Sequence, residues 1–160
     1  MSESIVLIEG TKEQKYQSLL PQITAIITGE TDLIANMANI SSALKEQFEW
    51  WWVGFYLVKQ DQLVLGPFQG PIACTRIAKG RGVCGTAWVE GKTLIVKDVN
   101  QFAGHIACSS RSQSEIVLPL YHKGAVIAVL DVDSEHLDHF DQTDQQYLEQ
   151  LIKALEENMG

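Results

Sequence analysis

Two stretches near the N-terminus carry the hydrophobic spacing of amphipathic helices. Thr11, followed three residues later by Gln14, is typical of a helix N-cap. Apolar residues then recur at helical spacing as far as Gly29. Pro21 lies inside this run, so we expect the helix to be kinked or split there. Thr31 is expected to cap a second helix, whose apolar face comprises Leu33, Met37, Ile40 and Leu44.

The hydrophobic period then changes from that of a helix to that of a strand. Residues 50–58, WWWVGFYLV, are rich in aromatic and β-branched side chains and predict a strand. Strict alternation would place Trp51, Val53, Phe55 and Leu57 on one face, and Trp50, Trp52, Gly54 and Tyr56 on the other. Further short elements are expected as strands near 63–65, 74–77 and 94–96 and as a helical stretch at 86–90.

The last third of the chain predicts a loop, a hairpin and a closing helix. Residues 98–114 show no sustained period and predict a long loop with one helical turn, a feature that is usually functional inside a compact domain. Residues 115–121 and 125–133 predict a hairpin. Asp141 is expected to cap the closing helix, whose apolar positions are Tyr147, Leu148, Leu151, Ile152 and Leu155.

The turn of this hairpin decides which side chains share a face. It could contain two residues, Lys123 and Gly124, or three, 122–124. A two-residue turn would place Glu115 opposite Val132 and mix charge into an apolar face. We therefore predict the three-residue turn, with Gly124 at positive φ. Its register pairs Glu115 with Asp131, Leu118 with Ala128 and Leu120 with Val126, and its apolar face comprises Ile116, Leu118, Leu120, Val126, Leu130 and Val132.

The order of these elements predicts an α+β fold. Its central sheet should be mainly antiparallel, with the N-terminal and C-terminal helices packed on one face. The chain has 160 residues, of which 46% are hydrophobic, enough for one core and too few residues for two full domains. We see no repeat or linker, and we expect a single domain over 1–160.

Charge and hydropathy narrow the classes of partner. The net charge is -8, and no run of Lys or Arg could form a basic face, so nucleic acid is not expected as a partner. No stretch approaches the length of a membrane span, and the N-terminus lacks the pattern of a secretory signal. We expect a cytoplasmic protein that does not bind membranes.

Three carboxylates gather on the predicted hairpin face opposite the apolar one. Glu115, Asp131 and Asp133 would repel one another unless a cation lies among them or one of them holds a proton, which raises a pKa toward neutrality. Such a group can donate a proton. Trp52 and Tyr56 beside these acids could surround an ammonium group. The alternatives are a solvated sheet face for the acids and ordinary core packing for the aromatic residues.

The three cysteines offer redox chemistry. Cys74, Cys84 and Cys108 form an odd set without an export signal, so a structural disulfide framework is not expected. His105 and Cys108 form one zinc half-site with no matching second half, and we predict no metal. His105 and Arg111 could each lower the pKa of the Cys108 thiol. Alternatively, a free cysteine is a small buried apolar residue.

Three segments carry a resemblance to a known family: WWVGFYLV, GPFQGPIACTRIAKGRGVCGTAW and LIVKDVNQFAGHIACSSRSQSEIVLPLYHKGAVIAVLDVDSE. Together they resemble the free methionine-(R)-sulfoxide reductases, which are stand-alone GAF domains, and the similarity extends from about residue 11 to 155. The resemblance implies reduction of the free amino acid, without a bound cofactor. It also implies a homodimer.

The resemblance further implies roles for the candidate residues. The Cys108 thiolate would attack the sulfoxide sulfur, methionine would leave, and the cysteine sulfenic acid would condense with a second cysteine to a disulfide that thioredoxin reduces. Cys84 is the first choice for this resolving cysteine and Cys74 the alternative. Trp52 and Tyr56 would form the pocket wall, and backbone N–H groups of 103–108 would receive the substrate carboxylate. The carboxylates Glu115, Asp131 and Asp133 would hold the substrate ammonium and protonate the sulfoxide oxygen.

Two other classes of protein share parts of this pattern. A GAF sensor would bind a small ligand without chemistry, but it has no need for three cysteines, and 160 residues leave no room for an output domain. A structural dimerisation module would explain the N-terminal helices but not the acidic cluster. We therefore expect the reductase.

Overall fold

Six strands form one antiparallel sheet in the computed structural model, which describes residues 4–105, 108 and 111–160. The strands are β1 (Trp52–Lys59), β2 (Gln62–Gln69), β3 (Arg76–Ala78), β4 (Leu94–Val96), β5 (Ser114–His122) and β6 (Ala125–Ser134), in the spatial order β3-β2-β1-β6-β5-β4. The helices are α1 (Lys12–Ile27), α2 (Leu33–Phe48), α3 (Gly82–Glu90) and α4 (Gln142–Glu157), and η1 (Val99–Gln101) is a single 3-10 turn.

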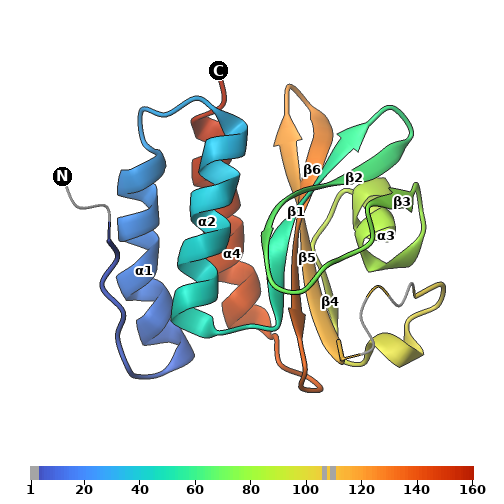
Figure 1. Cartoon of the computed structure of the whole chain (residues 1–160), viewed down its shortest axis with the longest axis horizontal. Coiled ribbons are helices and arrows are strands. Elements are labelled where there is room, and N and C mark those ends of the chain that lie inside the picture. The colour runs from blue at the N-terminus through green and yellow to red at the C-terminus, as the bar shows by residue number, and fades with distance from the viewer. Residues whose placement is uncertain (1–3, 106–107, 109–110) are drawn as a thin grey trace.

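The helices lie on opposite faces of this sheet. Figure 1 shows α1, α2 and α4 on one side of the strands and α3 on the other. The first side holds the larger apolar core, to which the central strands contribute Val53, Phe55, Ile116 and Leu130. The predicted α+β fold, with terminal helices on one face of an antiparallel sheet, is confirmed. Among the described residues, no helix is both long and apolar enough to cross a lipid bilayer.

The capping signals of α1, α2 and α4 agree with the structure with one exception. Thr11 and Gln14 form a reciprocal capping box at the start of α1, and Asp141 caps α4. Helix α1 is not split at Pro21. The predicted cap of α2 was wrong: the side chain of Asp32, rather than Thr31, accepts a hydrogen bond of 2.9 Å from the backbone N–H of Ala35. Aspartate and threonine are both good caps, so the choice depended on where the backbone turns.

The predicted turn of the β5–β6 hairpin was wrong. It contains two residues, Lys123 and Gly124, both at positive φ (52° and 81°), as a type I′ turn requires. Charge does not enter the core, because the register shifts by one residue between the pair Leu120–Ala128 and the pair Tyr121–Val126. This bulge reverses the alternation of β6.

The bulge leaves the predicted faces almost unchanged. Glu115 lies opposite Asp133 instead of Asp131, and Leu118 lies opposite Leu130. The true register therefore differs from the predicted one by two positions, and an even shift keeps every side chain on its face. The exception is Val126, on the turn side of the bulge, which packs toward α3, while Ala128 joins the helix-facing core.

The tryptophan segment departs from the predicted alternation at its start. Strand β1 begins at Trp52, so the two residues before it do not follow a strand period. Trp50 packs in the helix-facing core, and Trp51 packs toward the α3 side, the reverse of the prediction. From Trp52 onward the alternation holds, with Trp52 and Tyr56 on the α3 side and Phe55 on the helix side.

Helix α3 packs closely on the segment that precedes it. A Cβ atom on Gly85 would lie 2.8 Å from the carbonyl oxygen of Ala78, so only glycine permits this approach. The helix begins at Gly82, earlier than the predicted stretch of 86–90. The longer helix carries Cys84 in its first turn and buries it against the sheet.

Candidate active site

A cavity of about 50 Å³ lies between the sheet, α3 and the loop that follows η1. The predicted site residues that line it are Trp52, Tyr56, Cys84, Cys108, Glu115, Asp131 and Asp133. Cys74 is not in the lining, but it is bonded to Cys108, which is. The fold thus brings residues of β1, α3, the loop after η1, β5 and β6 to one place.

The carboxylates are buried rather than solvated. Glu115 and Asp131 are each 6% exposed, and Asp133 is half-buried. Burial raises the pKa of Glu115 well above its usual range, and the charges of Asp131 and Asp133 raise it further. Burial likewise raises the pKa of Asp131 and Asp133. The raised pKa values favour the protonated forms of these acids, as proton donation requires.

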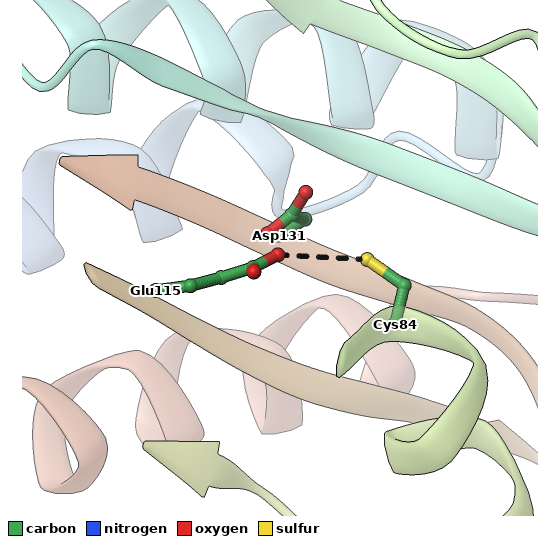
Figure 2. Close-up of side chains that lie close together, drawn as sticks. All are labelled: Cys84, Glu115 and Asp131. Carbon is green, nitrogen blue, oxygen red and sulfur yellow. Dashed lines mark hydrogen bonds between the residues drawn. The ribbon is translucent and has the colours of Figure 1, made fainter. Parts of the chain in front are cut away.

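Cys84 belongs to this acidic cluster. Figure 2 shows its side chain directed at Glu115, to which the thiol donates a weak hydrogen bond, with 3.9 Å between Sγ and Oε2. Burial is the main cause that raises the pKa of the Cys84 thiol, and the charges of Asp131 and Glu115 add to it. Cys84 is thus a neutral thiol and a poor nucleophile.

One oxygen of Asp131 has no hydrogen-bond donor within the part of the chain that the structure describes. This atom, Oδ1, is fully buried. A buried acceptor without a partner is costly, so Oδ1 is available to a proton on a neighbouring acid or to a donor on a ligand. Ligand atoms of Cys84, Glu115 and Asp131 also lie within 4.8 Å of one another, a spacing that a metal ion could use. That the site works without a metal therefore stays a prediction.

The aromatic wall is tied to the chain around Cys74. The rings of Trp52 and Tyr56 stack with 5.9 Å between their centroids. The indole N–H of Trp52 donates to the carbonyl of Pro71 at 3.1 Å, and the Tyr56 hydroxyl donates to the carbonyl of Cys74 at 2.8 Å. These two residues therefore shape the cavity and also position one of the cysteines.

Cys74 and Cys108 form a disulfide, with 5.4 Å between their Cα atoms and a separation of 34 positions in the sequence. Cys84 is a free thiol. The preference for Cys84 over Cys74 as the resolving partner does not agree with this pairing. The 70–75 segment approaches Cys108, whereas α3 directs Cys84 toward the carboxylates. Spacing along the chain carries no information on this choice.

The predicted loop contributes to the site as well. His105 lines the cavity, and burial lowers its pKa, so the imidazole is mostly neutral near pH 7 and gives little charge to stabilise a Cys108 thiolate. In the segment 103–108, predicted to bind the substrate carboxylate, residues 106 and 107 lie outside the described residues.

Two site residues were missed by the sequence reasoning. The Ser112 hydroxyl donates to Oδ1 of Asp133 at 3.2 Å. Nothing in the irregular 98–114 segment distinguishes this serine from its neighbours. Trp51 lines the cavity, and the guanidinium of Arg111 lies 5.3 Å from the centroid of its ring. Strand alternation had placed Trp51 on the opposite face.

Comparison with known proteins agrees with the geometry. The model of the GAF domain matches residues 30–157. The chain is 62% identical to GAF domain-containing protein A of Dictyostelium discoideum, over 98% of this chain and 99% of that protein. It is 49% identical to the free methionine-R-sulfoxide reductase of Escherichia coli, over 91% of this chain and 88% of the relative.

A solved structure of a free methionine-R-sulfoxide reductase is also similar to this chain. The free methionine-R-sulfoxide reductase from Neisseria meningitidis, in complex with its substrate, superposes with a TM-score of 0.95 at 53% identity. The match covers 98% of this chain and 95% of that one. The fold, the buried acids and the paired cysteines therefore have a common explanation: the chain is a GAF domain and belongs to the family of free methionine-R-sulfoxide reductases.

Proposed function

We propose that this protein reduces free L-methionine-(R)-sulfoxide to L-methionine by thiol chemistry at Cys108. One observation carries the proposal: Cys108 lines a cavity together with buried carboxylates whose pKa values are raised, and its sulfur is bonded to a second cysteine. A nucleophile, a proton source and a resolving thiol are the three groups that such a reduction needs.

The first step transfers oxygen from the substrate to the enzyme. In the reduced protein, the Cys108 thiolate attacks the sulfoxide sulfur while an acid of the cluster protonates the oxygen. The S–O bond of the substrate breaks, and the oxygen becomes bonded to the Cys108 sulfur as a hydroxyl group that keeps the donated proton. Methionine leaves and Cys108 is a sulfenic acid, so that the substrate is reduced by two electrons and the cysteine is oxidised by two. Glu115 and Asp133 are the proton donors that we favour, because they lie opposite each other on the strand pair.

Asp131 would orient the substrate. The unpartnered Oδ1 is an acceptor for the α-ammonium group, which is a strong donor, and the face of Trp52 would lie against the methyl end. A free α-ammonium group is present in the free amino acid and absent from a methionine inside a peptide. This argument supports the free amino acid as substrate.

The second step forms the disulfide. The thiol of Cys74 attacks the sulfenic sulfur of Cys108, water leaves, and the Cys74–Cys108 bond closes. An external dithiol protein of the thioredoxin type then returns both cysteines to thiols, and no bound cofactor takes part. A homodimer is the assembly we expect from the family resemblance.

The test is thioredoxin-coupled consumption of NADPH, run separately with the R and S diastereomers of free methionine sulfoxide and with a sulfoxide-containing peptide. We expect turnover with the free R form alone, accompanied by stoichiometric methionine. Binding of the sulfoxide without any methionine formed would remove the enzyme proposal and favour a ligand sensor.

A further inference from the structure

We infer that Ile72 is the apolar docking contact for the protein that reduces the Cys74–Cys108 disulfide. This inference deepens the proposed function and rests on it for the identity of the reductant, a thioredoxin-type dithiol. Ile72 is 91% exposed, although it lies in the mouth of a cavity whose deeper walls are buried. Single exposed apolar side chains are common on protein surfaces, and what distinguishes Ile72 is its place at the cavity beside the disulfide.

Its position places this side chain beside the reacting bond. Ile72 is two residues from Cys74 and lines the same cavity as Cys108. Both cysteines are half-buried, so a thiolate can attack the disulfide only after its protein has pressed its surface against this part of the chain. A reductant that reaches either sulfur must therefore approach Ile72.

The exposure of Ile72 is built into the fold. Two hydrogen bonds hold the chain on either side of it: the Trp52 indole N–H to the Pro71 carbonyl at 3.1 Å, and the Tyr56 hydroxyl to the Cys74 carbonyl at 2.8 Å. Both donors are buried residues of β1. The strand thus presents Ile72 outward in the oxidised state, which is the state that the reductant has to recognise.

The chemistry served by this contact is thiol–disulfide exchange. A thiolate of the reductant attacks one sulfur of the Cys74–Cys108 bond, giving a mixed disulfide and a cysteine thiolate that takes up a proton. The second thiol of the reductant then attacks the mixed disulfide and releases the other cysteine. The reductant ends as a disulfide, having passed on two electrons and two protons.

The experiment compares a protein reductant with a small one. The oxidised protein, prepared with the Cys74–Cys108 disulfide, is mixed with reduced thioredoxin or with dithiothreitol, and the second-order rate constant of its reduction is measured. This readout needs no methionine sulfoxide. It therefore stays informative if the wild-type protein forms no methionine, an outcome that would contradict the proposed function alone.

The variant is Ile72→Ser, and Ile34→Ser is its matched control. Ile34 is also exposed (51%), but it lies on α2, on the opposite side of the sheet from α3. We expect Ile72→Ser to lower the rate constant with thioredoxin about tenfold, as truncation of a central interface residue does, and to leave the rate with dithiothreitol unchanged. Ile34→Ser should change neither rate.

Two results would overturn the inference. One is an unchanged rate with thioredoxin in Ile72→Ser. The other is an equal loss with both reductants, which would show that Ile72 controls the disulfide itself. A slow first turnover of the reduced variant, with the thioredoxin rate intact, would make Ile72 a substrate contact instead.

Discussion

Glu115 and Asp133 lie directly opposite each other across β5 and β6, on the sheet face that lines the cavity. Burial is the main cause that raises the pKa of both carboxyl groups, and the charges of the neighbouring acids add to it. The pair therefore keeps a proton, and Ser112 donates a hydrogen bond to its Asp133 member. A proton held beside a reactive cysteine is what reduction of a sulfoxide requires.

Asp131 should matter for turnover and hardly for folding. We expect Asp131→Ala to lower kcat/KM about 100-fold or more, the scale of a lost acid or orienting group. Its free energy of unfolding should not fall below that of wild type, because the substitution removes a costly buried acceptor, Oδ1, that has no donor among the described residues. Coupled turnover and urea unfolding check both quantities. Glu46→Ala, at an exposed position of α2, is the control and should change neither kcat/KM nor the free energy of unfolding. Unchanged kinetics in Asp131→Ala would remove that residue from the site.

The acidic cluster should make the protein less stable as pH rises. The pKa of Glu115 is raised in the folded protein. The folded protein therefore keeps a proton on this side chain that the unfolded chain releases near the usual pKa of 4.5. This contribution is fully present below that value and is lost as pH rises through the folded pKa. Glu115→Gln removes the ionisation. The free energy of unfolding of Glu115→Gln minus that of wild type should therefore grow between about pH 5 and pH 8; a constant or shrinking difference would contradict the raised pKa.

Single-turnover methionine yield separates the cysteine roles. Cys108→Ser should release no methionine, because a hydroxyl is far less nucleophilic than a thiol. Cys74→Ser should release about one methionine per subunit and then stop, since its sulfenic acid has no partner and a dimedone-type probe can trap it. Cys84→Ser should continue through several turnovers, because this buried, neutral thiol takes no part in the disulfide. Stalling of Cys84→Ser, with continued turnover of Cys74→Ser, would restore Cys84 as the resolving residue.

Trp52 should contribute to substrate binding through its ring and its N–H group. Trp52→Phe keeps an aromatic ring but loses the donor to Pro71, so we expect KM for the sulfoxide to rise several-fold with a smaller change in kcat. Trp50→Phe is the matched control: this tryptophan is equally buried but packs on the opposite sheet face. Steady-state kinetics of both variants provide the measurement. An equal rise in KM for the two variants would mean that general loosening of the core, rather than a lost site contact, is responsible.

Much of the fold and part of the site followed from periodicity alone. The helix caps at Thr11 and Asp141 are local, since a side chain bonds to backbone three residues away. The acids were assigned to the correct face of the hairpin although the predicted register was wrong. A strand alternates with a period of two, so the error of two positions left Glu115, Asp131 and Asp133 together.

Only the tertiary structure decided the features that depend on contacts between distant segments. Burial of the acids requires α3 to pack over them, and the pairing of Cys74 with Cys108 requires a chain segment held by Trp52 and Tyr56. The bulge in β6 allows a two-residue turn to close the hairpin while the charged side chains stay out of the core. The sequence by itself determined which groups could react, because residue type and period are local properties. Their pKa values and their partners depend on burial and distance, which exist only once the chain has folded.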